Sequence, residues 1–187
     1  MTQMSRFTIH DDETAPAGSL PVLKGALSRA GQLPNLLGVL ANSPAALRAY
    51  ARMTAELGQG VLHPGTVARI ALAVASHYGS QPGLEVRTRT ARRAGVGLDE
   101  IARARKFDSL DPAHATLLRW VRALMADRGR VADALHEEVL EAGWGEEHLV
   151  EAVAVVALES FAALVNVAGD VPVDGSSEET RQLRAVA

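Results

Sequence analysis

The sequence predicts an all-α protein, a bundle of eight to nine helices in one domain. Alanine, leucine and valine make up most of the apolar content of the 187 residues, while aromatic residues contribute only 4 %. This composition suits closely packed helices better than a β-sandwich. From residue 20 onward the apolar residues recur at helical spacing, and no stretch alternates as a strand would. A hydrophobic content of 48 % with 22 % charged residues excludes wholesale disorder.

Proline, glycine and capping residues mark the expected helix boundaries in order. Pro34 begins a short apolar helix, and Ser43-Pro44 provides an N-cap and first turn for the next helix, which ends at Gly58. Residues 67–76 are nearly all apolar, which predicts a central helix. Further helices are expected over residues 84–94, 99–106, 112–125, 130–142 and 146–168. The expected organisation is a polar N-terminal arm (1–18), a helical domain (19–174) and a polar tail (175–187).

The net charge of −3 conceals an asymmetry along the chain. Residues 1–132 carry 17 basic and 10 acidic side chains, whereas residues 133–187 carry 2 basic and 12 acidic ones. Segments of opposite charge attract each other within or between subunits, or steer an anionic ligand. We therefore expect a homo-oligomer that weakens with salt, and a small anionic molecule as a partner. A pI of 6.1, with no aromatic residues among the arginines, argues against a nucleic-acid partner.

The composition also bears on where the protein is located and on which chemistry it can perform. No apolar run approaches the ~20 residues of a membrane span, and the polar start is unlike a secretory signal, so we expect a cytoplasmic protein without a membrane partner. The chain has no cysteine, which excludes disulfides, thiolate metal sites and thiol catalysis. We expect no metal and no cofactor.

Four short phrases follow one another along the chain. They are Gly-Gln-Leu-Pro-Asn at 31–35 with Ala-Asn-Ser-Pro at 41–44, Ile-Ala-Leu-Ala-Val at 70–74, Ala-Gly-Val at 94–96 before Asp-Glu-Ile at 99–101, and Asn166 before Val-Pro-Val-Asp at 171–174. In this order and spacing, residues 33–174 resemble the carboxymuconolactone decarboxylase and alkyl hydroperoxidase D (AhpD-like) superfamily. The resemblance implies an AhpD-like helical bundle that associates through helical faces.

The peroxidase branch of that family carries a glutamate, a C-x-x-C pair and a histidine. At the corresponding positions this chain has Ala68, Ser80, Gly83 and Arg87, so every element is replaced. A serine hydroxyl has no accessible anion at neutral pH and forms no disulfide. The chain is therefore expected to be a divergent member that is not a thiol peroxidase.

Four residues, three of them between positions 77 and 87 and the fourth at position 159, have both a structural and a functional interpretation. Ser80, just before Pro82, is either a helix N-cap or a nucleophile activated by His77, which is otherwise an ordinary helix-end histidine. Arg87 is either a clamp for a carboxylate or a solvent-exposed or ion-paired cation. Glu159 lies in a strongly apolar helix and must be paired or protonated. Pairing with an arginine is the structural interpretation and a functional acid the other.

Two function classes remain open. In the first, the protein is a non-redox enzyme or binder acting on a small carboxylated or lactone-like molecule. Its candidate catalytic residues are His77, Ser80 and Arg87, and its candidate ligand-binding residues are Arg87 and Glu159. Any enzymatic activity would then be lyase- or decarboxylase-like. In the second, it is a degenerate, non-catalytic homologue with a structural or partner-binding role. A ligand-sized pocket that contains Arg87 and His77 would favour the first class. If side chains such as Leu84 and Val86 fill this space instead, the second class is favoured.

Overall fold

The computed structural model describes residues 5–175, and this part of the chain is helical without strands. The expected all-α class is therefore confirmed. Of the expected tail, residues 176–187 lie outside the described residues. The nine helices of the described chain are α1 (Leu20–Ala30), α2 (Asn35–Leu40), α3 (Pro44–Leu57), α4 (Pro64–His77), α5 (Gln81–Arg93), α6 (Leu98–Ala104), α7 (Pro112–Ala126), α8 (Asp133–Glu141) and α9 (Glu146–Ala168).

Side-chain caps set several helix starts, and some boundaries differ from the sequence expectation by two or three residues, among them the starts of α5 and α8. Helix α5 begins at Gln81 rather than at residue 84, because the Ser80 hydroxyl accepts the Gly83 N–H and Pro82 fits the first turn. Helix α8 begins at Asp133 rather than at residue 130, because Ala132 before it is extended, with a φ of −61° and a ψ of 139°. An extended residue cannot be part of a right-handed helix.

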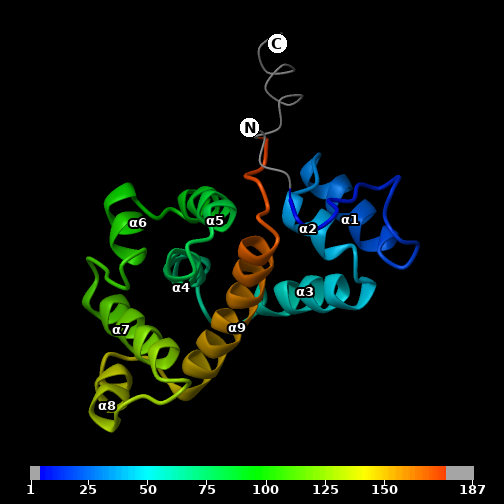
Figure 1. The fold of residues 1–187 in the computed structure, drawn as a ribbon. Coiled ribbons are helices and arrows are strands. Elements are labelled where there is room, and N and C mark those ends of the chain that lie inside the picture. The colour runs from blue at the N-terminus through cyan, green and yellow to red at the C-terminus, as the bar shows by residue number, and fades with distance from the viewer. Residues whose placement is uncertain (1–4, 176–187) are drawn as a thin grey trace.

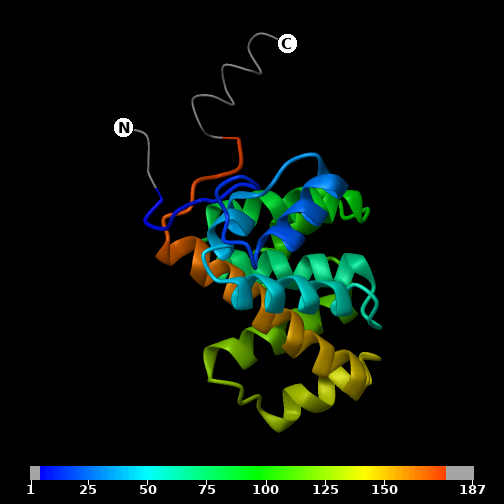
Figure 2. The same cartoon turned by 90° about the vertical axis from the view of Figure 1, so that its right-hand side faces the viewer.

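Helix α9 connects the two parts of the hydrophobic core. In Figure 1 it runs diagonally through the molecule, with α1, α2 and α3 on one side and α4 to α8 on the other. Its first half contributes Ala152, Val155 and Val156 to a large core shared with α4, α6, α7 and α8. Its second half contributes Leu158 and Ala162 to a smaller core shared with α1, α2 and α3. Figure 2 shows α8 at the opposite end of the molecule from the N-terminal segment.

The expectation that no apolar stretch is long enough for a membrane span is wrong for α9. By length and composition alone, it is the one helix of residues 5–175 that could cross a bilayer. In the structure α9 packs against α2, α3, α4, α5 and α7. Its contribution to two cores accounts for part of its apolar sequence, while Val150, Val153, Leu164 and Val167 are exposed.

A carboxylate of α9 fixes the loop between α3 and α4. Glu151 Oε2 accepts the backbone N–H groups of Val61 and Leu62 at 2.7 and 3.1 Å. A Cβ at Gly60 would lie 1.6 Å from Glu151 Oε1, so this approach requires glycine. These hydrogen bonds hold the loop against α9, and the loop thereby fixes where α4 begins at the centre of the bundle.

The N-terminal segment lies along the surface near the end of α9. The Arg6 N–H donates to the Gly169 carbonyl at 2.7 Å, and its guanidinium pairs with Asp170 at 2.6 Å. The His10 N–H donates to the Gly38 carbonyl at 3.1 Å. Most of residues 5–18 are exposed, as expected for an arm, but backbone hydrogen bonds hold this arm against α2 and α9.

A buried ion pair joins α4 to α6. Arg69 Nε donates to Glu100 Oε1 at 2.6 Å, and the carboxylate also accepts the Ser109 hydroxyl and the Leu110 N–H. Burial raises the pKa of Glu100, but the hydrogen bonds from Arg69, Ser109 and Leu110 and the charge of Arg69 outweigh it. The pKa of Glu100 is therefore below its ordinary value.

This pair gives a prediction for acid stability. Because the folded-state pKa of Glu100 is depressed, its contribution is fully present above the unfolded-state pKa and is lost as the pH falls through the folded-state pKa. Glu100→Gln should lower the free energy of unfolding at pH 7 by about 2 kcal/mol. The difference from wild type should shrink below about pH 4.5, where the unfolded glutamate begins to protonate. Urea unfolding from pH 7 to pH 3 measures this, and a difference that does not change with pH would contradict it.

Candidate functional site

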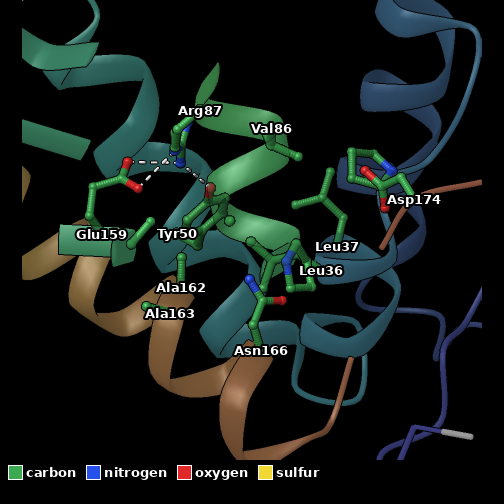
Figure 3. A pocket seen from close by; sticks show the side chains of 14 residues that line it. Leu36, Leu37, Tyr50, Val86, Arg87, Glu159, Ala162, Ala163, Asn166 and Asp174 are labelled. Carbon is green, nitrogen blue, oxygen red and sulfur yellow. Dashed lines mark hydrogen bonds and ion pairs between the residues drawn. The ribbon is translucent and has the colours of Figure 1, made fainter. Parts of the chain in front are cut away.

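A cavity of about 140 Å³ lies between α2, α3, α5 and α9. Most of its lining is apolar, with Leu36 and Leu37 from α2, Val86 from α5, and Ala162 and Ala163 from α9. Figure 3 shows polar side chains in three places on the wall: Arg87, Glu159 and Tyr50 in one, Asn166 in another, and Asp174, which accepts the Asn35 N–H at 2.8 Å, in the third. The cavity therefore suits a small, mostly apolar molecule with polar groups at defined points.

The first polar group is a bidentate ion pair. Arg87 Nε donates to Glu159 Oε2 at 2.8 Å, and Arg87 Nη2 lies 2.7 Å from Glu159 Oε1. Nη2 also donates to the Tyr50 hydroxyl at 3.3 Å. The Arg87 and Glu159 side chains are 19 % and 7 % exposed, so water screens the pair little. Three helices, α3, α5 and α9, meet at this cluster.

The electrostatics of the pair keep Arg87 charged. Burial lowers the pKa of the Arg87 guanidinium, but the negative charge of Glu159 and the hydrogen bonds to Glu159 and Tyr50 more than offset this, so its pKa is raised. For Glu159, burial raises the pKa of the carboxyl, and the charge and hydrogen bond of Arg87 offset this only in part. Glu159 thus holds a proton more readily than a surface glutamate.

Ser80 and Asn166 form the second polar group. The Ser80 hydroxyl is buried, accepts the Gly83 N–H at 3.3 Å and accepts Asn166 Nδ2–H at 3.2 Å. A Cβ at Gly83 would lie 2.8 Å from Ser80 Oγ, so a larger residue there would displace the hydroxyl. The N-cap interpretation of Ser80 is confirmed.

His77 lies apart from this group. It is exposed at the end of α4, and its ring contacts the rings of Tyr78 and Phe107 edge-on, at centroid distances of 5.2 and 6.2 Å. The structure shows no hydrogen bond from His77 to Ser80 within residues 5–175 and does not place His77 on the cavity wall. The serine–histidine pair considered from the sequence is therefore not assembled.

The comparisons by sequence find nothing, since no family model and no curated protein matches the chain. Solved structures do match. A peroxidase-related protein with an alkylhydroperoxidase AhpD core from Ralstonia eutropha JMP134 has 16 % identity and a TM-score of 0.82, over 96 % of both chains. A peroxidase-related protein from Silicibacter sp. TM1040 has 17 % identity and a TM-score of 0.77, over 92 % of this chain and 94 % of that one. A cysteine-to-alanine variant of the debrominase Bmp8, in complex with 2,3,4-tribromopyrrole, has 18 % identity and a TM-score of 0.71, over 100 % of this chain and 99 % of that one.

This chain has the AhpD-like fold. The fold suggested by the four sequence phrases is therefore confirmed, and it occurs here without cysteine. A dithiol cycle cannot operate in this AhpD-like protein, because two sulfur atoms are needed to form and reduce a disulfide.

The residues that the sequence resemblance aligns with the family motif have structural roles in this AhpD-like chain. Ala68 is buried in the large core, Ser80 caps α5, and Gly83 allows the close approach to Ser80. Arg87, at the histidine position, pairs with Glu159, so the predicted pairing of that carboxylate with an arginine is confirmed. Of the predicted site residues, the structure brings Arg87 and Glu159 together on the cavity wall.

Sequence reasoning gave no role to Tyr50 or Asn166, although both line the cavity. Asn166 did carry a signal, since it is an amide in a strongly apolar helix, two turns after Glu159 on the same face. Tyr50 carried none, because an aromatic residue at helical spacing is ordinary in a core.

The ion pair predicts an asymmetric response to mutation. Arg87→Met leaves the buried Glu159 without a partner and should lower the free energy of unfolding by about 3 kcal/mol. The double variant Arg87→Met, Glu159→Met removes both charges and should recover most of this loss. Urea unfolding of the two single variants and the double variant measures the coupling. Losses that simply add in the double variant would contradict a direct pair.

Proposed function

We propose that the protein binds a small, mostly apolar molecule carrying a carbonyl oxygen in the cavity between α2, α3, α5 and α9, without thiol chemistry. The observation that carries the proposal is the combination of an apolar wall with one buried cluster of hydrogen-bond donors. Such an arrangement is typical of small-molecule sites, where a few polar groups orient an otherwise apolar ligand. The proposal retains the class of ligand expected from the sequence, a carboxylated or lactone-like molecule.

The donors at the cluster favour the lactone-like end of that class. Arg87 Nε and Nη2 are occupied by Glu159, while Nη1 has no hydrogen-bond partner within residues 5–175. The Tyr50 oxygen accepts from Arg87, which leaves its own proton available for a ligand oxygen. A neutral carbonyl accepts from these donors without bringing a second negative charge beside Glu159. Donors directed at a carbonyl oxygen also polarise it, which is a first requirement of lyase-like chemistry.

One fold neighbour supports a small cyclic ligand. The debrominase Bmp8, which shares the fold over the whole chain, was crystallised with 2,3,4-tribromopyrrole, a small ring compound. The cavity of this chain is lined largely by leucine, valine and alanine side chains, which match the apolar surface of a ring.

One observation favours the second function class, a non-catalytic role. Arg87 is already neutralised by Glu159, and such a pair by itself would be a sufficient structural reason for both residues. The filling of the window by Leu84 and Val86, which this class would require, is not seen: Val86 lines an open cavity and Leu84 is buried outside its lining. Ligand binding at the cavity distinguishes the two classes.

The first test of the proposal is thermal stabilisation by small ring carbonyl compounds. Cyclohexanone and δ-valerolactone should raise the Tm of the protein, by mass action worth about 2.7 kcal/mol at a hundredfold excess over Kd. Cyclohexanecarboxylate should raise it less, because its charge meets Glu159. Tyr50→Phe removes one donor and should weaken the binding of both neutral compounds about tenfold.

A cavity-filling variant and a matched control locate the effect. Ala163→Leu places three further carbons into the cavity and should abolish the shift. Ala49→Leu makes the same change on the exposed side of α3 and should leave the shift intact. If no neutral ring carbonyl compound changes the Tm of wild type, the proposal fails and the non-catalytic class is preferred.

We also propose that two copies of the chain associate, with the surface around Leu110 of one copy against the surface around Val150 of the other. Leu110 is 62 % exposed and lines a shallow surface hollow with Arg103, Lys106, Asp99 and Asp108. Arg103 pairs with Asp108 at 2.7 Å, which leaves Lys106 as the cation of this hollow outside an ion pair of the described residues. Val150 is 70 % exposed, one turn after the exposed Glu146 and Glu147. An apolar side chain and one cation on the first surface can thus meet an apolar side chain and two carboxylates on the second.

Such an assembly should be salt-sensitive. Light scattering at low ionic strength should give a mass that is a multiple of 19.8 kDa. This mass should fall in about 1 M salt, where ions screen the attraction between exposed charges more than about 3 Å apart. Glu147→Lys should weaken the assembly at low salt, while Glu56→Lys, an exposed position on α3, should not. A monomer under both conditions would contradict the proposal.

A further inference from the structure

Asn166 has a buried amide oxygen that no group of the described chain satisfies. Within residues 5–175, four buried side-chain polar atoms have no hydrogen-bond partner, and Asn166 Oδ1 is the one that belongs to a residue lining the cavity. The residue as a whole is 4 % exposed. A buried acceptor without a donor costs free energy, so a donor supplied by a bound molecule would be stabilising there.

The amide nitrogen of Asn166 faces Ser80. Asn166 Nδ2 donates to Ser80 Oγ at 3.2 Å, and Ser80 Oγ also accepts the Gly83 N–H at the start of α5. The amide nitrogen is thereby directed toward Ser80, which leaves the oxygen on the other side. In Figure 3 the Asn166 side chain rises from α9 toward Leu36, which lines the cavity.

The cavity is also lined by Asp174, whose carboxylate already accepts the Asn35 N–H and lies 3.8 Å from Arg89. The other two polar groups, around Glu159 and Asn166, are separated along one helix. Glu159, which holds Arg87, and Asn166 are seven residues apart on α9, which corresponds to about 10 Å along the helix axis. The Arg87–Tyr50 group offers donors, and Asn166 Oδ1 offers an acceptor. A ligand that satisfies both must carry an acceptor at one end and a donor at the other.

We propose that Asn166 is a specificity-determining residue that selects ring carbonyl compounds bearing a hydroxyl or N–H group on the side of the ring opposite the carbonyl. The carbonyl oxygen accepts from Tyr50 and Arg87, and the hydroxyl or N–H donates to Asn166 Oδ1. Ser80 acts as a positioning residue, because its hydroxyl holds the amide nitrogen away from the cavity. This inference rests on the proposed function, since it assigns the polarity of the ligand for the same cavity.

The test compares two ring ketones that differ in one group. 4-Hydroxycyclohexanone and 4-methylcyclohexanone have nearly the same size and shape, but only the first has a donor opposite its carbonyl. Isothermal titration calorimetry with wild-type protein should give a Kd about tenfold lower for the hydroxyl compound. This comparison needs no variant and so does not depend on the folding of one.

Variants then assign the preference to Asn166. Asn166→Leu should bind 4-methylcyclohexanone at least as tightly as wild type and lose the tenfold preference for the hydroxyl compound. Ser80→Ala should reduce the preference, because the amide is then free to turn. Ala49→Leu should retain it.

The outcomes separate this inference from the proposed function. If both ketones bind wild type equally well, the role of Asn166 is overturned while the proposed function stands. If neither ketone nor δ-valerolactone binds, the proposed function itself fails. A tenfold preference that persists in Asn166→Leu also overturns the inference, because another residue would then recognise the hydroxyl.

Discussion

The ion pair between Arg87 and Glu159 is the interaction on which the site depends. It joins α5 to α9, and through Tyr50 it also reaches α3, so three helices are held at one point inside a largely apolar wall. The charges of Arg87 and Glu159 are tolerated with so little exposure because each carboxylate oxygen is paired with one guanidinium nitrogen. The same geometry leaves the Tyr50 proton and Arg87 Nη1 as the donors of the cavity. Structural pairing and ligand binding are thus compatible uses of one guanidinium.

Ser80 and Gly83, which the sequence resemblance aligns with the two cysteines of the family motif, have structural roles here. Ser80 caps α5, and Gly83 leaves space for the Ser80 hydroxyl where a side chain would collide with it. That hydroxyl in turn accepts a hydrogen bond from Asn166. The Ser80–Asn166 group is separate from the cluster of Arg87, Glu159 and Tyr50. Neither group can transfer electrons through a disulfide.

Helix α9 shows why some inferences from sequence were sound and others were not. Its apolar periodicity located it within residues 146–168, and the presence of Glu159 in it correctly indicated a buried pair. Its length and composition also satisfy the criterion for a membrane span, contrary to the expectation from the sequence. Part of the apolar circumference of α9 faces the two cores, and another part, which includes Val150 and Leu164, is exposed. Composition does not distinguish these situations, because it records which residues are apolar and not what they contact.

The sequence by itself determined local features, such as helix starts, and excluded whole classes of chemistry. The absence of cysteine excluded thiol chemistry, the caps at Ser43 and Ser80 set helix starts, and helical periodicity gave the bundle. Only the tertiary structure decided which side chains meet. Arg87 and Glu159 are separated by 72 residues and Ser80 and Asn166 by 86, so neither pair follows from spacing. His77 and Ser80, three residues apart, do not pair, because the end of α4 directs the histidine toward Phe107. Local propensity acts over a few residues, whereas the packing of α5 on α9 fixes contacts between distant segments, and that packing placed the site.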